Sequence, residues 1–318
     1  MTTLAIVAAV LGAGALVTFF GARWIERANP PRGRFIEVAA GRQHVIELGE
    51  ATRAAAAPPV VLLHGAGANL GDMQLALGEK LAAKQHRVIL IDRPGLGWSE
   101  RKGREAGSTA EQAAILRDVL DRLGVNRAIL VGHSFGGTLA LAFALAFPQR
   151  VAALVLIAAP THPGMRFLTL INAALSTPLG FLFAHTLALP FGAIFIAPGT
   201  RTAFLPQTPP HRYLKRTAAL LVLRPASLLA NWADVGGLEE FLAGQIEHYG
   251  KLAAPTIAVV GDHDFIVPPR QHIAELAVVA PNVKVVELAG FGHMLHHAAA
   301  DRVIAAIEEM ASSSSLVR

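Results

Sequence analysis

Six short, mainly apolar runs limit, more than any other feature, how this chain can fold. Each is four to seven residues long and rich in valine, leucine, isoleucine or alanine, as strands buried on both faces are. The runs are Val60–Leu63, Val88–Ile91, Ala128–Val131, Val151–Ile157, Thr256–Val260 and Val283–Leu288. Helical patterns lie between or after them, at Asp72–Lys84, Thr109–Leu123, Phe135–Phe147, Pro269–Ala280 and Ala298–Met310. Such alternation predicts an α/β fold whose mainly parallel sheet has helices on both faces.

Two further strand-like runs precede these six. Arg34–Val38 and His44–Leu48 flank a predicted turn at Ala40 and Gly41, so they predict a hairpin and an eight-stranded sheet. The composition fits such a core, because 53% of the residues are hydrophobic and 16% are charged, which excludes disorder over most of the chain. We expect the core to comprise residues 29–160 and 246–311, with a disordered tail at 312–318.

The segment 161–245 interrupts the alternation. It has no clear strand pattern, and it contains no Asp, Glu, Lys or Arg from Phe167 to Thr200. Its prolines divide it into pieces of about a dozen residues, which are too short to span a bilayer unaided. The segment therefore predicts a helical cap between two strands. Its apolar stretch is either ordinary core or the wall of an acyl-binding pocket that faces a membrane.

An uncharged run of nineteen residues, Leu4 to Ala22, lies near the N-terminus. As a helix it would be about 28 Å long, close to the thickness of the hydrocarbon layer. Trp24 and several arginines follow it, so the positive-inside rule predicts a membrane anchor through residues 4–22 with the rest of the chain on the cytoplasmic side. A cleaved signal peptide and a buried leader helix are the alternatives. If residues 1–28 are only anchor and linker, their deletion should leave a soluble protein.

The cysteine count and the charge distribution exclude several functions. The chain has no cysteine, so it has no disulfide scaffold, no thiolate metal site and no cysteine nucleophile. The net charge is +5, but the basic residues are spread along the chain. We therefore expect no nucleic-acid partner, because a nucleic-acid groove needs clustered positive charge.

A Gly-x-Ser-x-Gly motif, Gly132-His133-Ser134-Phe135-Gly136, follows one predicted strand and opens the next predicted helix. Strand, sharp turn and helix form the setting in which this motif presents a reactive serine. Small residues on both sides of Ser134 permit the strained turn, and the N-terminus of the following helix favours negative charge.

The motif resembles the nucleophile loop of the α/β-hydrolase family, and the resemblance extends over roughly Arg34 to Met310. Four further segments match the family in order, each after a predicted strand. They are His64-Gly65-Ala66-Gly67, the turn from Asp92 to Ser99, Gly261-Asp262-His263-Asp264 and Gly290-Phe291-Gly292-His293. The resemblance implies an α/β-hydrolase fold with a helical cap and a serine, aspartate and histidine triad.

The resemblance implies a role for each matched residue. Ser134 would be the nucleophile and His293 its base, because an imidazole can accept and return a proton near pH 7. Asp264 would orient His293, with Asp262 as the less favoured candidate. Backbone N–H groups of Ala66 and Phe135 would bind the oxyanion.

Four other residues are candidates for substrate contact: His64, Gly65, His133 and Phe183. His64 and His133 are also consistent with structural roles. His293, His296 and His297 have a spacing that metal sites use, but no carboxylate accompanies them in the sequence. We therefore expect no metal and no cofactor.

These features predict a serine hydrolase that cleaves an apolar ester or lipid-like small molecule through an acyl-enzyme. Thioester, carbon–carbon bond and perhydrolysis chemistry can use the same triad, and the fold does not separate them. A membrane-tethered binding protein that keeps the fold without catalysis is the alternative from another class.

Overall fold

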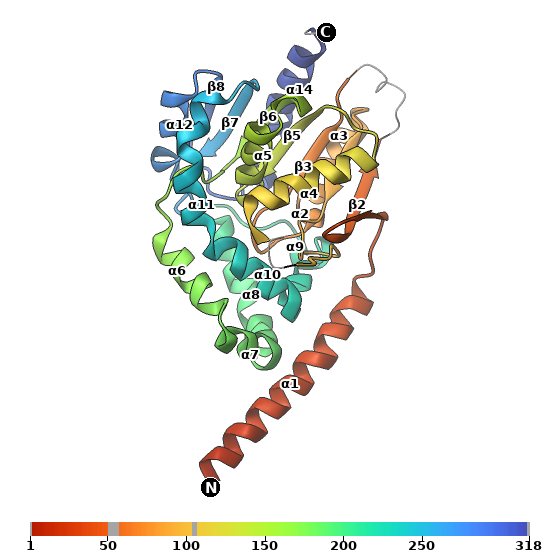
Figure 1. Cartoon of the computed structure of the whole chain (residues 1–318), viewed down its shortest axis with the longest axis vertical. Helices are drawn as coiled ribbons and strands as arrows, with labels where there is room; N and C mark the ends of the chain where they lie inside the picture. The colour runs from red at the N-terminus through yellow and green to blue at the C-terminus, as the bar shows by residue number, and fades with distance from the viewer. Residues whose placement is uncertain (1, 50–56, 104–106, 317–318) are drawn as a thin grey trace.

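Eight strands form one sheet in the part of the chain that the computed structural model describes, residues 2–49, 57–103 and 107–316 (Figure 1). Along the sheet the order is β1-β2-β4-β3-β5-β6-β7-β8. The pairs β1–β2 and β2–β4 are antiparallel and all other pairs are parallel. The strands are β1 (Arg34–Val38), β2 (Gly41–Leu48), β3 (Val60–Leu63), β4 (Val88–Ile91), β5 (Ala128–His133), β6 (Val151–Ile157), β7 (Thr256–Gly261) and β8 (Val283–Leu288). The predicted α/β fold is confirmed.

Helices cover both faces of the sheet because its central strands are apolar on both sides. β3, β4, β5, β6 and β7 are buried at every residue. One face packs on α4 (Thr109–Arg122), α5 (Phe135–Ala146) and α12 (Ile273–Val279). The other packs on α2 (Leu70–Met73), a π-helical turn at Gln74–Gly78, α3 (Glu79–Ala83) and α14 (Ala300–Leu316). Each face thus has its own apolar core.

The C-terminal segment differs from its prediction. The expected helix at 298–310 is present as α14, which begins at Ala300 and continues to Leu316, and a separate short helix, α13 (Leu295–Ala298), precedes it. Residues 312–316, where a disordered tail was expected, thus extend α14, whereas residues 317–318 lie outside the described residues. The hydroxyls of Ser312 and Ser313 donate to the carbonyls of Glu308 and Glu309 and so stay within the helix.

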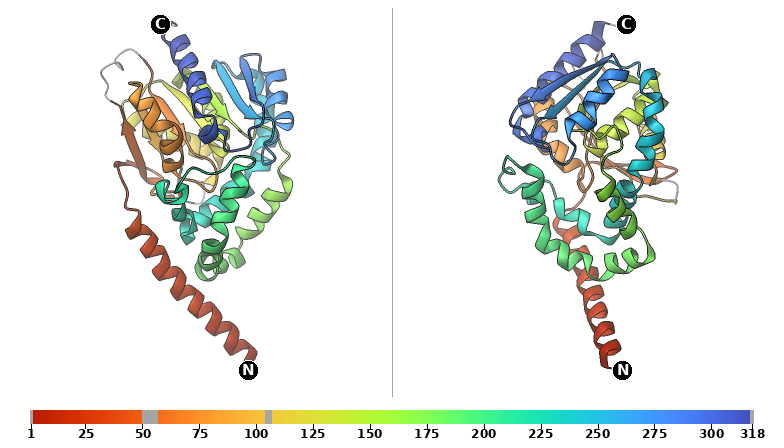
Figure 2. Two further views of the ribbon diagram at one scale, coloured as in Figure 1. Left: turned by 180° about the vertical axis from the view of Figure 1, so that it is seen from behind. Right: turned by 90° about the vertical axis from the view of Figure 1, so that its left-hand side faces the viewer.

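The segment between β6 and β7 is helical, as predicted, and lies beyond one end of the sheet (Figures 1 and 2). Pro178 and Pro225 occupy first turns of cap helices, where the missing N–H needs no partner. Pro198 lies inside the seventeen-residue α8, so the prolines divide the cap less strictly than expected. The cap helices are α6 (Arg166–Leu175), α7 (Pro178–Thr186), α8 (Ala188–Phe204), α9 (Tyr213–Arg216), α10 (Pro225–Gly236) and α11 (Leu238–Gln245).

The N-terminal helix α1 (Thr2–Ala28) is long and apolar enough to cross a membrane, as an anchor or a signal sequence would be. It is mostly exposed along its length. Its C-terminal part packs on the cap, where Thr18 Oγ1 donates to Thr186 O at 2.9 Å and Ile25 is buried. Its N-terminal part projects beyond the cap (Figure 2). α1 is therefore partly attached to the folded body, which the sequence did not predict.

Candidate active site

Ser134 lies in the sharp turn between β5 and α5, with φ 51° and ψ −124°. A non-glycine residue in this conformation is strained by about 1–3 kcal/mol, so the surrounding structure must hold it there. Two glycines make this possible. A Cβ on Gly132 would lie 2.2 Å from Gly136 O, and a Cβ on Gly136 would lie 2.3 Å from Leu63 O. The turn consequently needs glycine at both positions of the motif.

His293 and Asp264 form a buried pair on the loops that follow β8 and β7. His293 Nδ1 donates to Asp264 Oδ2 at 2.8 Å. Asp264 Oδ1 accepts from the backbone N–H groups of Ile266 at 2.9 Å and Val267 at 2.8 Å. Asp264 thus has a fixed orientation, and it leaves His293 Nε2 as the ring atom free to act as a base.

Asp262 lies elsewhere, at the exposed side of the same loop. Its Oδ1 accepts from the Gly290 N–H at 2.6 Å and pairs with His263. The hydrogen bond to His263, and to a smaller extent that from Gly290, holds the pKa of the Asp262 carboxyl below its usual range. Asp262 therefore braces the loops after β7 and β8 against each other, while Asp264 contacts His293.

Ser134 and His293 line one cavity of about 360 Å³ between the cap and the strand ends. Its wall is mainly apolar, and no Lys or Arg is among the described residues that form it. The loop at 64–67 runs beside Ser134, because a Cβ on Gly65 would lie 3.1 Å from Ser134 Cβ. The lining also includes Ala66, Asp72, His133, Phe135, Met165, Leu168, Ile196, Phe204, Tyr213, Leu238 and Met294.

The backbone at Ala66 and Phe135 borders this cavity. Phe135 is the first residue of α5, so its N–H has no acceptor within the helix. The positive end of the helix dipole lies at the same place. An anion that forms beside Ser134 would therefore meet a favourable field.

A family model described as the α/β hydrolase fold matches residues 58–300, which is most of the chain. The chain belongs to the α/β-hydrolase family. This α/β hydrolase is 32% identical over 203 residues to a 2-hydroxymuconate semialdehyde hydrolase of Pseudomonas putida, covering 58% of this chain and 68% of that protein. It is 40% identical over 110 residues to a 2-hydroxy-6-oxononadienedioate/2-hydroxy-6-oxononatrienedioate hydrolase of Paraburkholderia phymatum, but this match spans only 34% of the chain and 38% of the relative.

Solved structures support the fold. A thermophilic esterase from Thermogutta terrifontis superposes with a TM-score of 0.71 at 22% identity, covering 89% of this chain and 99% of the esterase. At this identity the likeness concerns the arrangement of the chain and not the substrate.

Arg93, in the turn after β4, connects the parts of this α/β hydrolase that surround the site. It is fully buried, and its Nε donates to His64 O at 3.2 Å. Its Nη1 donates to Asp234 Oδ2 on α10 at 2.6 Å. Its guanidinium lies 4.2 Å from the ring centroid of Phe135. One side chain therefore links the loop at 64–67, the cap and Phe135, the residue after Ser134.

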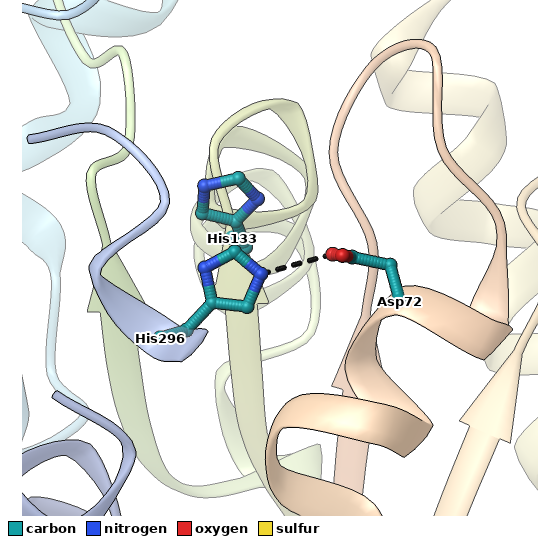
Figure 3. Close-up of side chains that lie close together, drawn as sticks. All are labelled: Asp72, His133 and His296. Carbon is teal, nitrogen blue, oxygen red and sulfur yellow. Dashed lines mark hydrogen bonds and ion pairs between the residues drawn. The ribbon is translucent and has the colours of Figure 1, made fainter. Parts of the chain in front are cut away.

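A buried polar group around Asp72 borders the cavity of the hydrolase. Figure 3 shows Asp72 with His133 and His296 of this group. Asp72 Oδ2 accepts from His296 Nε2 at 2.9 Å, and Asp72 Oδ1 accepts from His297 Nε2 at 2.7 Å and from the Tyr213 hydroxyl at 2.7 Å. Burial raises the pKa of the Asp72 carboxyl, but the two imidazoles outweigh this and bring it well below its usual range. Asp72 is therefore a buried carboxylate at the substrate cavity.

Asp72, His133 and His296 have ligand atoms within 4.8 Å of one another, so the group was tested as a metal site. The two imidazole rings are tilted by 34° to each other, with centroids 3.9 Å apart. The Asp72 carboxylate already accepts from three donors, His296, His297 and the Tyr213 hydroxyl. His133 Nε2 is also occupied, since it donates to His293 O at 3.1 Å. The arrangement fits a hydrogen-bonded wall better than a metal centre.

Of the four residues expected to contact substrate, the structure places one at the cavity and three outside its lining. His133 lines the cavity, whereas His64, Gly65 and Phe183 are not among the described residues that do. His64 Nε2 accepts from the Arg93 N–H at 2.9 Å and its Nδ1 donates to Gly65 O at 2.9 Å, so it braces the loop. Phe183 stacks on Trp232 inside the cap. The sequence reasoning also missed Asp72, the carboxylate that accompanies His296 and His297.

Proposed function

We propose that this α/β hydrolase cleaves uncharged carboxylic esters with apolar acyl groups, through an acyl-enzyme on Ser134. The hydrogen bond between His293 and Asp264, at the cavity that holds Ser134, carries this proposal. Asp264 accepts the Nδ1 proton, so Nε2 of the neutral imidazole is the available base. A binding protein without catalysis would need neither this pair nor a strained serine.

The reaction proceeds in two halves. Ser134 Oγ attacks the ester carbonyl while His293 Nε2 takes its proton, and the N–H groups of Phe135 and Ala66 stabilise the oxyanion. His293 then protonates the departing alcohol, and Asp264 offsets the charge of the imidazolium. In the second half His293 takes a proton from water, whose oxygen attacks the carbonyl of the acyl-enzyme. The bond to Ser134 Oγ then breaks, His293 returns the proton to Oγ, and the acid leaves.

The charge of the cavity wall bears on the substrate. Among the described residues that line the cavity, Asp72 is the one acidic residue, and none is Lys or Arg. A buried anionic substrate needs a cation or several donors, and it would be repelled by the Asp72 carboxylate. An uncharged, apolar substrate meets no such penalty.

Carbon–carbon bond hydrolysis is the second candidate, because the names of the curated relatives place them among hydrolases of 2-hydroxy-6-oxo-dienoates and related acids. A dienedioate carries two carboxylates. This chain offers them no lysine or arginine among the described cavity residues, which favours the ester.

We further propose that α1 anchors the protein in a membrane through residues 4–22, with the catalytic domain on the cytoplasmic side. The helix is long and apolar enough, and Arg23 and Arg27 follow the uncharged run. An apolar ester or lipid-like molecule would be the substrate that such a location supplies.

A kinetic series on the full-length protein tests the ester proposal. Esters from acetyl to decanoyl are compared with a 2-hydroxy-6-oxo-dienoate, and a fluorophosphonate probe reports on Ser134. We expect labelling of Ser134 and a kcat/KM that rises with chain length, since each buried methylene contributes up to about 0.8 kcal/mol. Faster turnover of the dienoate than of every ester would favour carbon–carbon cleavage. A lack of labelling would favour the binding protein.

A further inference from the structure

The outer side of the cap exposes many large apolar side chains. Ten residues of α6, α7 and α8 have exposed fractions of 40% or more. They form what we name the apolar cap face: Phe167, Leu168, Leu170, Ile171, Leu179, Phe181, Leu182, Phe191, Ile194 and Phe195. A soluble monomer rarely exposes so much apolar surface in one region, and such surfaces mark contact with a partner or a membrane.

The composition of these helices identifies the kind of partner. From Phe167 to Thr200 the chain contains no Asp, Glu, Lys or Arg. A protein interface normally surrounds its apolar centre with a polar rim, whereas a lipid-facing surface lacks charge throughout. The helices α6 and α7 are together apolar enough for a membrane segment, but they are bent by 78° with respect to each other. Each is too short to span a bilayer, which fits a hairpin that enters from one side.

The contact between α1 and the cap fixes the depth of this surface. Gly14 of α1 packs so closely on Thr186 that an added Cβ would lie 2.7 Å from Thr186 O, and Thr18 bonds the same carbonyl. Gly14 and Thr18 lie inside the uncharged run 4–22. Eight residues separate Gly14 from the end of that run, which corresponds to about 12 Å of helix. A bilayer that contains α1 therefore also contains the end of α7.

Arg23 and Glu26 follow the uncharged run of α1, and Arg224 of the cap pairs with Glu26 at 3.2 Å. A groove of about 1,410 Å³ beside them is lined by residues of α1, of the cap and of the turn that contains Trp98. Its charged lining residues are Arg23, Glu26, Arg42, Glu100, Arg101, Lys102 and Arg224. These charged residues suit the layer of polar headgroups. The N-terminal part of α1 and the cap face would then lie in the hydrocarbon.

We infer that the apolar cap face is embedded in the lipid bilayer beside α1, so that α6 and α8 separate the hydrocarbon from the catalytic cavity. Ile196 lines that cavity, and Leu168 borders it at the edge of the cap face, while their neighbours Phe167 and Phe195 are 80% and 62% exposed. The two helices thus present apolar residues both inward and outward. This arrangement suits substrates with acyl chains dissolved in the bilayer. The inference rests on the proposed anchoring by α1.

The absence of cysteine from the chain permits a direct test with single labels. Full-length Leu179→Cys, Ala9→Cys and Val278→Cys variants carry a nitroxide in vesicles of phosphatidylcholine and phosphatidylglycerol. Leu179 on α7 and Val278 on α12 are matched, because both are apolar and are 79% and 83% exposed. Position 9 reports on α1 alone. Collision of each nitroxide with oxygen, which is lipid-soluble, is compared with collision with a nickel chelate, which stays in water.

We expect the ratio of oxygen to nickel collisions at positions 179 and 9 to exceed that at position 278 by about tenfold, because the hydrated chelate does not enter hydrocarbon. A lipid-like ratio at position 9 with a water-like ratio at 179 would overturn the inference and leave the anchor standing. A water-like ratio at position 9 would overturn the anchor and the inference together. Spin–spin broadening at 179 with protection from both reagents would assign the face to a second copy of the chain and also overturn the inference.

Discussion

Arg93 donates a 2.6 Å hydrogen bond from Nη1 to Asp234 Oδ2, and the two buried side chains join the core of the protein to its cap. Asp234 Oδ1 also accepts from Gln112 Nε2 at 2.9 Å and pairs with Arg101. Burial lowers the pKa of Arg93, which Asp234 opposes. The pair fixes α10 over the loop at 64–67 and beside Phe135.

Asp234→Asn should therefore destabilise the protein and reduce its activity. Removal of one partner from a buried ion pair costs about 3–5 kcal/mol, because the remaining charge is left uncompensated. Thermal unfolding in detergent and ester kinetics measure the two effects. Asp301→Asn is the control, since Asp301 pairs with Lys80 at the surface, and it should change neither. Equal behaviour of the two variants would contradict the structural role of Asp234.

Asp264→Asn should cost far more activity than Asp262→Asn. The amide keeps the shape of Asp264 but loses the charge that stabilises the imidazolium, an effect of about 10⁴-fold in kcat in serine proteases. Asp262 contacts Gly290 and His263 instead, so its amide variant should stay within about twofold of wild type. Reversed severity in steady-state kinetics would transfer the orienting role to Asp262.

Replacement of Ser134 separates catalysis from backbone strain. Ser134→Ala and Ser134→Gly should both lose at least about 10⁴-fold in turnover. The glycine variant should be more stable than the alanine variant by about 1 kcal/mol, because glycine adopts the φ of 51° at this position without strain. Chemical denaturation of both variants gives the difference. A glycine variant less stable than the alanine variant would contradict a strained turn.

Stability should decrease as the pH falls from about 6.5 to 4. Burial lowers the pKa of His64 to about 4, so in this range the unfolded chain binds a proton that the folded chain does not. The stabilisation by neutral His64 is complete above pH 6.5, and about 3 kcal/mol is lost by pH 4. Denaturation curves from pH 7.5 to 4.5 measure the slope. His64→Gln should give a shallower slope than wild type, and an unchanged slope would exclude His64 as its source.

Deletion of residues 1–28 should not leave a soluble enzyme, contrary to the expectation from the sequence. Ile25 is buried against Leu189, Leu221 and Leu223, and the deletion would expose this cluster. Deletion of residues 2–13 removes only the projecting part of α1 and should retain the thermal stability of the full chain. Fractionation and thermal unfolding compare the two. A soluble Δ1–28 protein as stable as Δ2–13 would contradict the packing of α1.

The sheet could be predicted because each strand is a short apolar run between turns, and the bounds of β3 and β4 agree to the residue. Ser134, Asp264 and His293 could be predicted because each lies in a local motif after a strand. Asp72 and Arg93 could not be assigned, because their partners are distant: Asp72 bonds His296 across 224 positions, and Arg93 bonds Asp234 across 141. The packing of α1 was missed for the same reason.

If α1 is the membrane anchor proposed above, its attachment to the cap also determines how this enzyme meets its substrate. A catalytic domain on a flexible tether would sample all orientations above a membrane. Here Gly14 and Thr18 hold the cap against the helix, so a bilayer that contained α1 would fix one orientation of the catalytic domain. Encounter then becomes a search by lateral diffusion in two dimensions. The rate should follow the mole fraction of substrate in the lipid, and dilution of the substrate with inert lipid should slow turnover even at constant bulk concentration.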